Sequence, residues 1–288
     1  MPEEPADPDP EHQVIATLTA GQRLPVAVVG PGDDAAILGD GRLLAVDAMV
    51  EGVHWDERST PRQVGRKLFA VNASDIAACG GRVEWALLTL CLPQPLDQDW
   101  VKGFSAGLRE ALGPVPLLGG DTTRSPGPRM ASLTLGGRLV GPPLLRSGAG
   151  PGQDLWVSGR LGAAADAFHG EGPLQPLVDP APPLGLGPLL AERGLATAAM
   201  DLSDGLAADL PRLCRASGVG ARVDTLPTSS TLERALGFGD DYELLFTALP
   251  RHRAEILSLP FDLTRIGATD SEPVIVLPAH ATGWRHFS

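Results

Sequence analysis

Two patterns of hydrophobic residues, short apolar runs and apolar residues at helical spacing, occur in the N-terminal half of the chain and predict a mixture of strands and helices. Short apolar runs bounded by Gly, Pro and Asp predict strands in 24–38 (broken by a turn), 42–55, 84–93, 115–126 and 130–141. Apolar residues at helical spacing predict helices over 12–20, 60–81 and 98–112. Thr60 and Pro61 suit the N-cap and first position of the second helix, which Gly80 and Gly81 end.

The Gly- and Pro-rich stretch 141–153 predicts a boundary between two domains. Beyond it we expect strands at 154–159 and 241–250, a loop at 173–188, and helices near 161–169, 186–194 and 203–216. Pro211 lies inside the last helix and predicts a kink or a restart. Strands and helices mix without strict alternation, which favours an α+β fold. The expected division is a disordered lead-in at 1–11, an N-terminal domain at 12–142 and a C-terminal domain at 143–288.

Composition and charge exclude several classes of protein. The 288 residues are 43% hydrophobic and 20% charged, which is typical of a globular protein of about two domains. A net charge of −12 argues against nucleic-acid binding. Three scattered cysteines favour neither a disulfide framework nor a zinc site, so a reducing cytoplasm is expected. Residues 1–11 resemble neither a signal peptide nor a membrane span, and no membrane association is expected.

Acidic residues recur at loop positions directly after apolar strands or near helix ends. Turn chemistry accounts for any one of them, but not for six, namely Asp34, Asp47, Asp75, Asp121, Asp201 and Asp204. If these carboxylates converge they repel each other, and a hard cation removes that repulsion. Oxygen ligands without His or Cys predict Mg²⁺, usually with a bound polyphosphate. The sequence has no Walker A loop and no protein-kinase motif set, so any ATP phosphates would depend on metal ions and arginine, with Arg146 a candidate.

The segment "MDLSDGLAADL" places Asp201, Ser203 and Asp204 together at the predicted start of a helix. An N-cap explains Ser203 alone but not both carboxylates. We expect the two acids to hold metal and Ser203 to hydrogen-bond a phosphate at the helix N-terminus.

A family resemblance rests on motifs that occur in a fixed order. They are "GDDAAIL", "VDAMVEGVHW", "VNASDIAACGG", "LLGGDTTRSP", "LLRSGAGPG", "MDLSDGLAADL", "GDDYELLFT" and "GWRHF". In this order, over residues 12–287, the chain resembles the thiamine-monophosphate kinases. Most of the motifs are shared with a wider superfamily that includes aminoimidazole ribonucleotide synthetase, whereas "VEGVHW" and "GWRHF" are specific to the thiamine enzymes.

The resemblance implies a fold, a reaction and a set of site residues. The fold is the two-domain aminoimidazole ribonucleotide synthetase-like one, with an N-terminal α+β domain that pairs in a homodimer and a C-terminal α/β domain. The reaction is phosphorylation of thiamine monophosphate by ATP to thiamine pyrophosphate, by direct in-line transfer assisted by several Mg²⁺ ions, in thiamine pyrophosphate biosynthesis. The implied Mg²⁺ ligands are the six aspartates above. The implied ATP contacts are Gly120, Asp121, Arg146 and Ser203, with Asp121 and Arg146 catalytic. The implied thiamine monophosphate contacts are His54, Asp240 and Trp284.

Three residues depart from the family pattern, so other functions remain as alternatives. Ala45 and Val46 stand where the family has hydroxyl residues, and Asp240 stands where it has Glu. One alternative is a superfamily member that phosphorylates another acceptor, and a second is a degenerate member that binds ATP without turnover. A third is a calcium-stabilised binding protein, although the chain has no DxDxDG loop.

Overall fold

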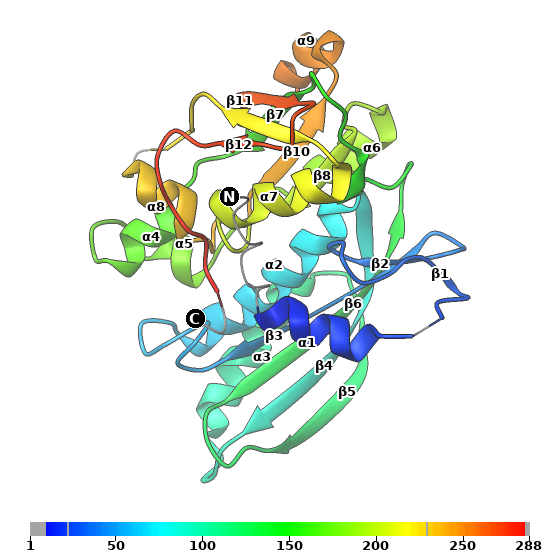
Figure 1. The fold of residues 1–288 in the computed structure, drawn as a ribbon. Coiled ribbons are helices and arrows are strands. Elements are labelled where there is room, and N and C mark those ends of the chain that lie inside the picture. Colours follow the sequence, from blue (N-terminus) through cyan, green and yellow to red (C-terminus); the bar gives the residue numbers. More distant parts are fainter. Residues whose placement is uncertain (1–9, 22, 229, 286–288) are drawn as a thin grey trace.

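The protein consists of two six-stranded sheets with a long helix, α2 (Pro61–Ala78), between them (Figure 1). The structure is a computed structural model that describes residues 10–21, 23–228 and 230–285. In sheet order, the first sheet contains β1 (Ala27–Val29), β2 (Ala36–Leu38), β3 (Arg42–Val50), β6 (Met130–Leu139), β4 (Gly81–Leu92) and β5 (Leu117–Arg124). Its helices are α1 (Pro10–Thr19), α2 and α3 (Gln98–Leu112).

The second sheet begins with β7 in chain order and is mostly antiparallel. In sheet order it contains β12 (Ile275–Val276), β9 (Gly220–Val223), β11 (Leu263–Asp270), β7 (Asp154–Ser158), β10 (Leu244–Ala248) and β8 (Ala198–Asp201). Its helices are α4 (Ala163–Phe168), α5 (Gln175–Val178), α6 (Leu186–Arg193), α7 (Leu206–Ser217), α8 (Leu232–Gly237) and α9 (Arg253–Leu257), with 3₁₀ turns η1 (Arg146–Gly148) and η2 (Pro250–His252). The predicted boundary at 141–153 falls in the connection between β6 and β7.

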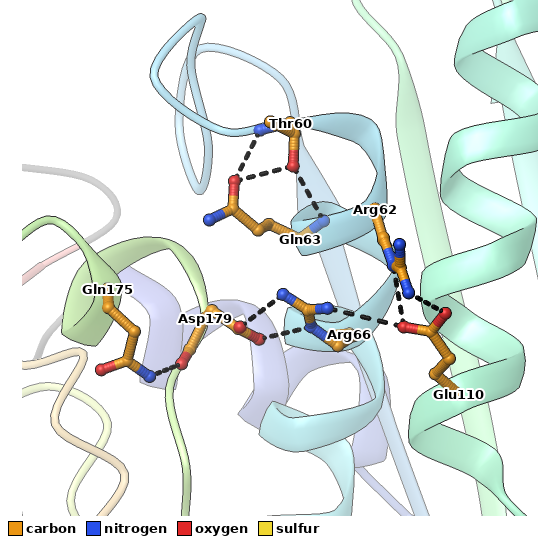
Figure 2. Close-up of polar contacts among 7 residues, drawn as sticks. All are labelled: Thr60, Arg62, Gln63, Arg66, Glu110, Gln175 and Asp179. Atoms are coloured by element: carbon orange, nitrogen blue, oxygen red, sulfur yellow. Dashed lines mark hydrogen bonds and ion pairs between the residues drawn. The ribbon is translucent and has the colours of Figure 1, made fainter.

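Helix α2 begins where the sequence predicts. The Thr60 hydroxyl accepts a hydrogen bond from the Gln63 backbone N–H, and the Gln63 side chain accepts from the Thr60 N–H, which forms a capping box (Figure 2). Most of the residues of α2 are buried, because β3 and α3 cover one side and β8 and α6 of the second domain cover another. A helix buried all round tolerates little displacement, so α2 fixes how the two domains lie against each other.

Two glycines allow α2 and α3 to approach closely. A Cβ atom on Gly65 would lie 2.3 Å from the Phe104 carbonyl oxygen, and one on Gly107 would lie 1.9 Å from the Arg62 carbonyl oxygen. Both clashes are with backbone atoms, which rotamer changes cannot relieve. The crossing of α2 and α3 therefore depends on glycine at both positions.

The sequence predicted most elements of the first domain and fewer of the second. β8, β9, α8, β11 and β12 were not predicted, and α5 lies inside the stretch 173–188 predicted as a loop. Pro211 causes no restart, since α7 runs through it from Leu206 to Ser217. Residues 1–9 of the predicted lead-in lie outside the described residues, and residues 10 and 11 begin α1. Across the described part of the chain, no helix has both the length and the apolar character to cross a membrane.

We expect Gly107→Ala to destabilise the protein by about 1–3 kcal/mol, because forcing a methyl group against backbone costs that much and outweighs the gain in helix propensity of about 1 kcal/mol. Urea denaturation followed by circular dichroism measures the change. Gly127→Ala is the matched control, since a Cβ there meets no atom within 4 Å. Equal midpoints for the two variants would contradict the close-packing role of Gly107.

Candidate active site

A cleft of about 940 Å³ lies between the two domains. The first domain contributes β3, the loop that follows it, and one face of α2. The second domain contributes α5 and the loops that precede α7 and β10. Residues from both domains line this cleft, so its shape depends on the packing around α2.

Five of the six predicted metal ligands gather at one end of the cleft. Asp47, Asp75, Asp201 and Asp204 line it. Carboxylate oxygens of Asp34, Asp75 and Asp201 lie within 4.8 Å of one another. They come from the turn before β2, from α2 and from the end of β8. Strand ends and a buried helix thus bring together acids that are far apart in sequence.

Buried amide and hydroxyl groups hold this end of the cleft in place. The Asn72 side-chain oxygen accepts from the Asp47 backbone N–H at 2.8 Å, and the Asn72 amide donates to the Leu68 carbonyl at 2.8 Å. The Ser132 hydroxyl donates to the Asp47 carbonyl at 3.0 Å. Asn72 is fully buried, and its hydrogen bond to Asp47 joins β3 to α2 one turn before Asp75. The carboxylates are therefore preorganised by groups that are not themselves ligands.

Burial raises the pKa values of the clustered carboxyl groups. Desolvation is the main cause in each case, and the neighbouring acids add to it. The pKa of Asp34 rises to about 8 and that of Asp201 to about 7. The pKa of Asp75 is also raised well above its usual range. The cluster holds protons near neutral pH unless a cation takes their place.

The donor set fits a hard divalent cation. Asp34 Oδ2 is buried and has no hydrogen-bond partner, a costly state that a cation would relieve. The cluster of Asp34, Asp75 and Asp201 offers only carboxylate oxygens, the ligands that Mg²⁺ prefers. Cys79 lies near Asp33 and Asp34, but burial raises the pKa of its thiol well above the usual range, so it stays protonated and is a poor ligand.

Two arginines balance part of this negative charge. Arg146 Nε donates to Asp34 at 3.0 Å, Nη2 of the same guanidinium contacts the same oxygen, and its backbone N–H donates to Asp33 at 3.2 Å. Arg212, which sequence reasoning missed, donates to Asp204 at 2.5 Å and to the buried Asp209 at 2.7 Å. Its position one turn after Asp209 on α7 is a signal that helix spacing could have supplied.

The predicted thiamine monophosphate contacts lie in the same cleft. His54, Asp240, Trp284 and the predicted ATP contact Ser203 all line it. His54 Nδ1 accepts from the Val50 backbone N–H at 3.0 Å, which assigns the ring proton of a neutral His54 to Nε2. Trp284 is 48% exposed at the cleft.

Several cleft residues were not predicted from the sequence. Phe168 and Phe238 pack with ring centroids 5.2 Å apart, and the Arg58 guanidinium lies 5.0 Å from the Phe168 centroid. Tyr242 lies beside Asp240, and both have positive φ angles, of 49° and 59°. These aromatic residues come from separate segments of the chain, so no periodic pattern in the sequence shows that they meet in one cleft.

Asp121 and Gly120 do not join the cluster within one copy of the chain. Asp121 pairs with Thr89 on β4, Thr89 with Ser132 on β6, and Ser132 with Ala48 on β3. Three strand spacings of about 4.8 Å place Asp121 about 14 Å from Ala48 across the sheet. Side chains in one row share a face, so Asp121 points to the face opposite Asp47. A Cβ on Gly120 would lie 1.7 Å from the Leu88 carbonyl oxygen, so β4 packing already requires glycine there.

The segment 201–205 differs in detail from the prediction. Helix α7 begins at Leu206 and its N-cap is Gly205, so Ser203 lies two residues before the cap. The Ser203 carbonyl accepts from the Asp240 backbone N–H at 2.8 Å. A Cβ on Gly205 would lie 2.8 Å from the Leu236 carbonyl oxygen, so this glycine makes room for the neighbouring loop. Ser203 nevertheless faces the cleft beside Asp201 and Asp204.

Fold and site together define a class of protein. Residues 32–141 match the N-terminal domain, and residues 151–273 the C-terminal domain, of the AIR synthase related proteins. The chain thus has the two-domain α+β fold of that class, with an acidic cleft between its domains.

Individual relatives narrow the class. The thiamine-monophosphate kinase of Escherichia coli K12 is 37% identical over 273 residues, which cover 81% of this chain and 82% of that enzyme. The solved structure described as "AaThiL complexed with AMPPCP and TMP" matches with a TM-score of 0.84 and 30% identity, over 96% of this chain and 97% of that one. The thiamine-monophosphate kinase of Stenotrophomonas maltophilia K279a matches with a TM-score of 0.75 and 36% identity, over 94% and 96%. The chain belongs to the thiamine-monophosphate kinase family of enzymes.

We expect protein treated with EDTA to lose stability as pH rises from 5 to 8. Asp34 and Asp201 have raised folded-state pKa values, so the folded state binds more protons than the unfolded state across this window. Each such group lowers the free energy of unfolding by about 1.4 kcal/mol per pH unit between its unfolded and folded pKa. Mg²⁺ should oppose this loss and stabilise more at pH 8 than at pH 6, because metal binding requires deprotonated carboxylates.

Urea titrations at several pH values, with EDTA or with Mg²⁺, measure both effects. Asp75→Asn should flatten the pH dependence and reduce the stabilisation by Mg²⁺, whereas Asp99→Asn, on an exposed carboxylate, should change neither. A pH profile that rises from 5 to 8 in EDTA would contradict the assignment.

Proposed function

We propose that the protein transfers the γ-phosphoryl group of ATP to thiamine monophosphate and forms thiamine pyrophosphate. The convergence of five aspartates in a cleft that also has an aromatic end carries this proposal. The structural relative that was solved in complex with AMPPCP and TMP supports it. Three free cysteines suit a reducing compartment, and we place the reaction in the cytoplasm.

Mg²⁺ is the proposed cofactor of the acidic end. Asp34, Asp47, Asp75, Asp201 and Asp204 would hold the ions, which would neutralise the phosphate groups of donor and acceptor and let the two anions approach in line. The acceptor phosphate is already anionic near neutral pH, so transfer needs no general base. The barrier lies in bringing two polyanions together, a task for positioning and electrostatics.

The chain itself contributes fixed positive charge and hydrogen bonds. Arg146 is mostly buried. Desolvation lowers the pKa of its guanidinium, but the adjacent acids, Asp34 above all, outweigh this and leave the pKa raised, so the group stays charged. In this position it would stabilise the charge that spreads over the transferred phosphoryl group. Ser203 would donate its hydroxyl to a phosphate oxygen between Asp201 and Asp204.

The aromatic residues of the cleft suit a cationic heteroaromatic acceptor. Trp284 and Phe168 expose about half of their surface there, and Phe238 packs against Phe168. Aromatic faces attract a thiazolium cation by cation–π interaction. Asp240 would accept a hydrogen bond from the aminopyrimidine, and His54 would donate from Nε2.

The departures at 45 and 46 do not weaken the acidic end. Ala45 is buried in the core against α2, whereas Val46 is 63% exposed. Neither position removes one of the five gathered carboxylates. A purely structural calcium protein would not need a large cleft with an aromatic end, which counts against that alternative.

We infer a homodimer formed through the outer face of the first sheet. All eight residues of β5 are exposed and one edge of the strand is unpaired. The exposed residues of β5 include Leu117 and Leu118, and Val46 and Leu87 on neighbouring strands of the same sheet are exposed as well. Exposed edge strands and apolar patches are unusual on monomers. In such a dimer Gly120 and Asp121 of one copy would face the partner, where they could complete its ATP site.

We expect the wild-type protein to form ADP and thiamine pyrophosphate from ATP and thiamine monophosphate in a Mg²⁺-dependent reaction. Asp75→Asn should lower kcat/KM by a factor of about 10²–10³, because it removes a charged group that organises the transition state. A coupled ADP assay with chromatography of the product measures both. Asp99→Asn should retain activity. No turnover of thiamine monophosphate, with turnover of another phosphate acceptor, would replace this function by the superfamily alternative.

We expect Asp121→Asn to be inactive although it remains dimeric by light scattering. A hybrid dimer that pairs an Asp75→Asn subunit with an Asp121→Asn subunit, purified with two different tags, should recover about half of the wild-type activity, because one of its two sites then has both aspartates. An inactive hybrid would place Asp121 in the site of its own subunit. A monomeric wild-type protein would refute the dimer.

A further inference from the structure

Lys67 places a buried ammonium group inside the wall of the cleft. The residue is 2% exposed and is one of two lysines in the chain. Its Nζ donates to Asp240 Oδ2 at 2.8 Å, to the Leu177 carbonyl at 3.0 Å and to the His54 carbonyl at 3.2 Å. An ammonium group has three donors, and all three are used by protein groups. Lys67 therefore has no donor left for a phosphate or an acceptor molecule.

The three partners of Lys67 come from three separate segments of the cleft wall. His54 belongs to the loop after β3 in the first domain, Leu177 to α5 and Asp240 to the loop before β10 in the second. All three residues line the cleft. One ammonium group thus fixes the relative positions of the segments that would surround the acceptor.

Asp240 is held by backbone and side-chain contacts together. Its φ of 59° is uncommon for a residue other than glycine. Its backbone N–H is bound to the Ser203 carbonyl, and its carboxylate is 27% exposed. The ion pair with Lys67 fixes the direction in which this carboxylate points into the cleft.

Stability alone is a weak reason for burying this charge. Replacing a buried ion pair with apolar residues is often neutral or stabilising, because desolvation offsets the attraction. The neighbouring Arg66 already joins α2 to the end of α5, through bonds of 2.9 and 2.6 Å to Asp179 (Figure 2). What Lys67 adds is contact with the Asp240 carboxylate and the His54 carbonyl, which belong to two of the three predicted acceptor contacts.

We propose that Lys67 is a positioning residue for the acceptor: it aims the Asp240 carboxylate and holds α5 and the His54 loop around the bound molecule. This inference rests on the proposed function, since it takes thiamine monophosphate as the molecule that Asp240 meets. Lys67 acts through Asp240 and does not touch the reacting atoms. Its loss should weaken acceptor binding and leave ATP binding unchanged.

Steady-state kinetics of Lys67→Met test this. We expect KM for thiamine monophosphate to rise about tenfold or more, the effect of losing a hydrogen bond to a charged group, with KM for ATP within about twofold of wild type. In an Asp240→Asn background the same substitution should change KM for thiamine monophosphate by less than about threefold, because the coupling partner is already altered. Arg66→Met is the matched control. It removes a neighbouring bond to the same wall and should lower the melting temperature without raising this KM.

Each result decides a different point. Inactive wild-type protein would refute the proposed function itself. Active wild type with an unchanged KM in Lys67→Met, or an equal rise in Arg66→Met, would refute the positioning role alone. If Lys67→Met does not fold, Asp240→Asn and Asp240→Ala replace it, because both leave Lys67 in place. Each must raise KM for thiamine monophosphate without raising KM for ATP. A KM for thiamine monophosphate equal to that of wild type would overturn the inference.

Discussion

The repulsion among buried carboxylates is the constraint on which the rest of the molecule depends. Asp34, Asp75 and Asp201 lie too close to be ionised together without a compensating charge. Protons, arginines and metal ions can each supply that charge. Arg146 and Arg212 form ion pairs with Asp34 and Asp204 at the edges of the cluster. The proposed Mg²⁺ would compensate the charge that remains, so we expect the site to be more stable with the cation bound.

The sequence revealed the acidic end of the cleft because its ligands follow a simple local rule. Asp47 and Asp201 each follow a short apolar run, and Asp75 lies late in a predicted helix, one turn after Asn72. Such positions can be read one segment at a time. The N-terminal strands and α2 were predictable for the same reason, since their periodicity and the cap at Thr60 are local.

What the sequence did not reveal depends on contacts between distant segments. Lys67 looks like an ordinary polar position on a helix until α5 and the loop at Asp240 close over it. Phe168 and Phe238 come from two short segments, and only the packing of α4 against α8 brings them together. The place of Asp121 was also beyond local rules, because strand order, and not strand content, puts β5 at the edge of its sheet.

One face of α2 joins the two ends of the cleft and gives the site its length. Lys67, Val71 and Asp75 are four residues apart, so they lie along one face of the helix. At 1.5 Å per residue, Lys67 and Asp75 are about 12 Å apart along the axis. That span separates Asp75 from the Lys67–Asp240 ion pair. Under the proposed function it would suit an acceptor with a phosphate at one end and a heteroaromatic ring at the other. Because α2 is capped at Thr60 and buried by both domains, it cannot shift one end of the site without shifting the other. Under the proposed function, selectivity for the acceptor and placement of its phosphate would both depend on this single rigid element.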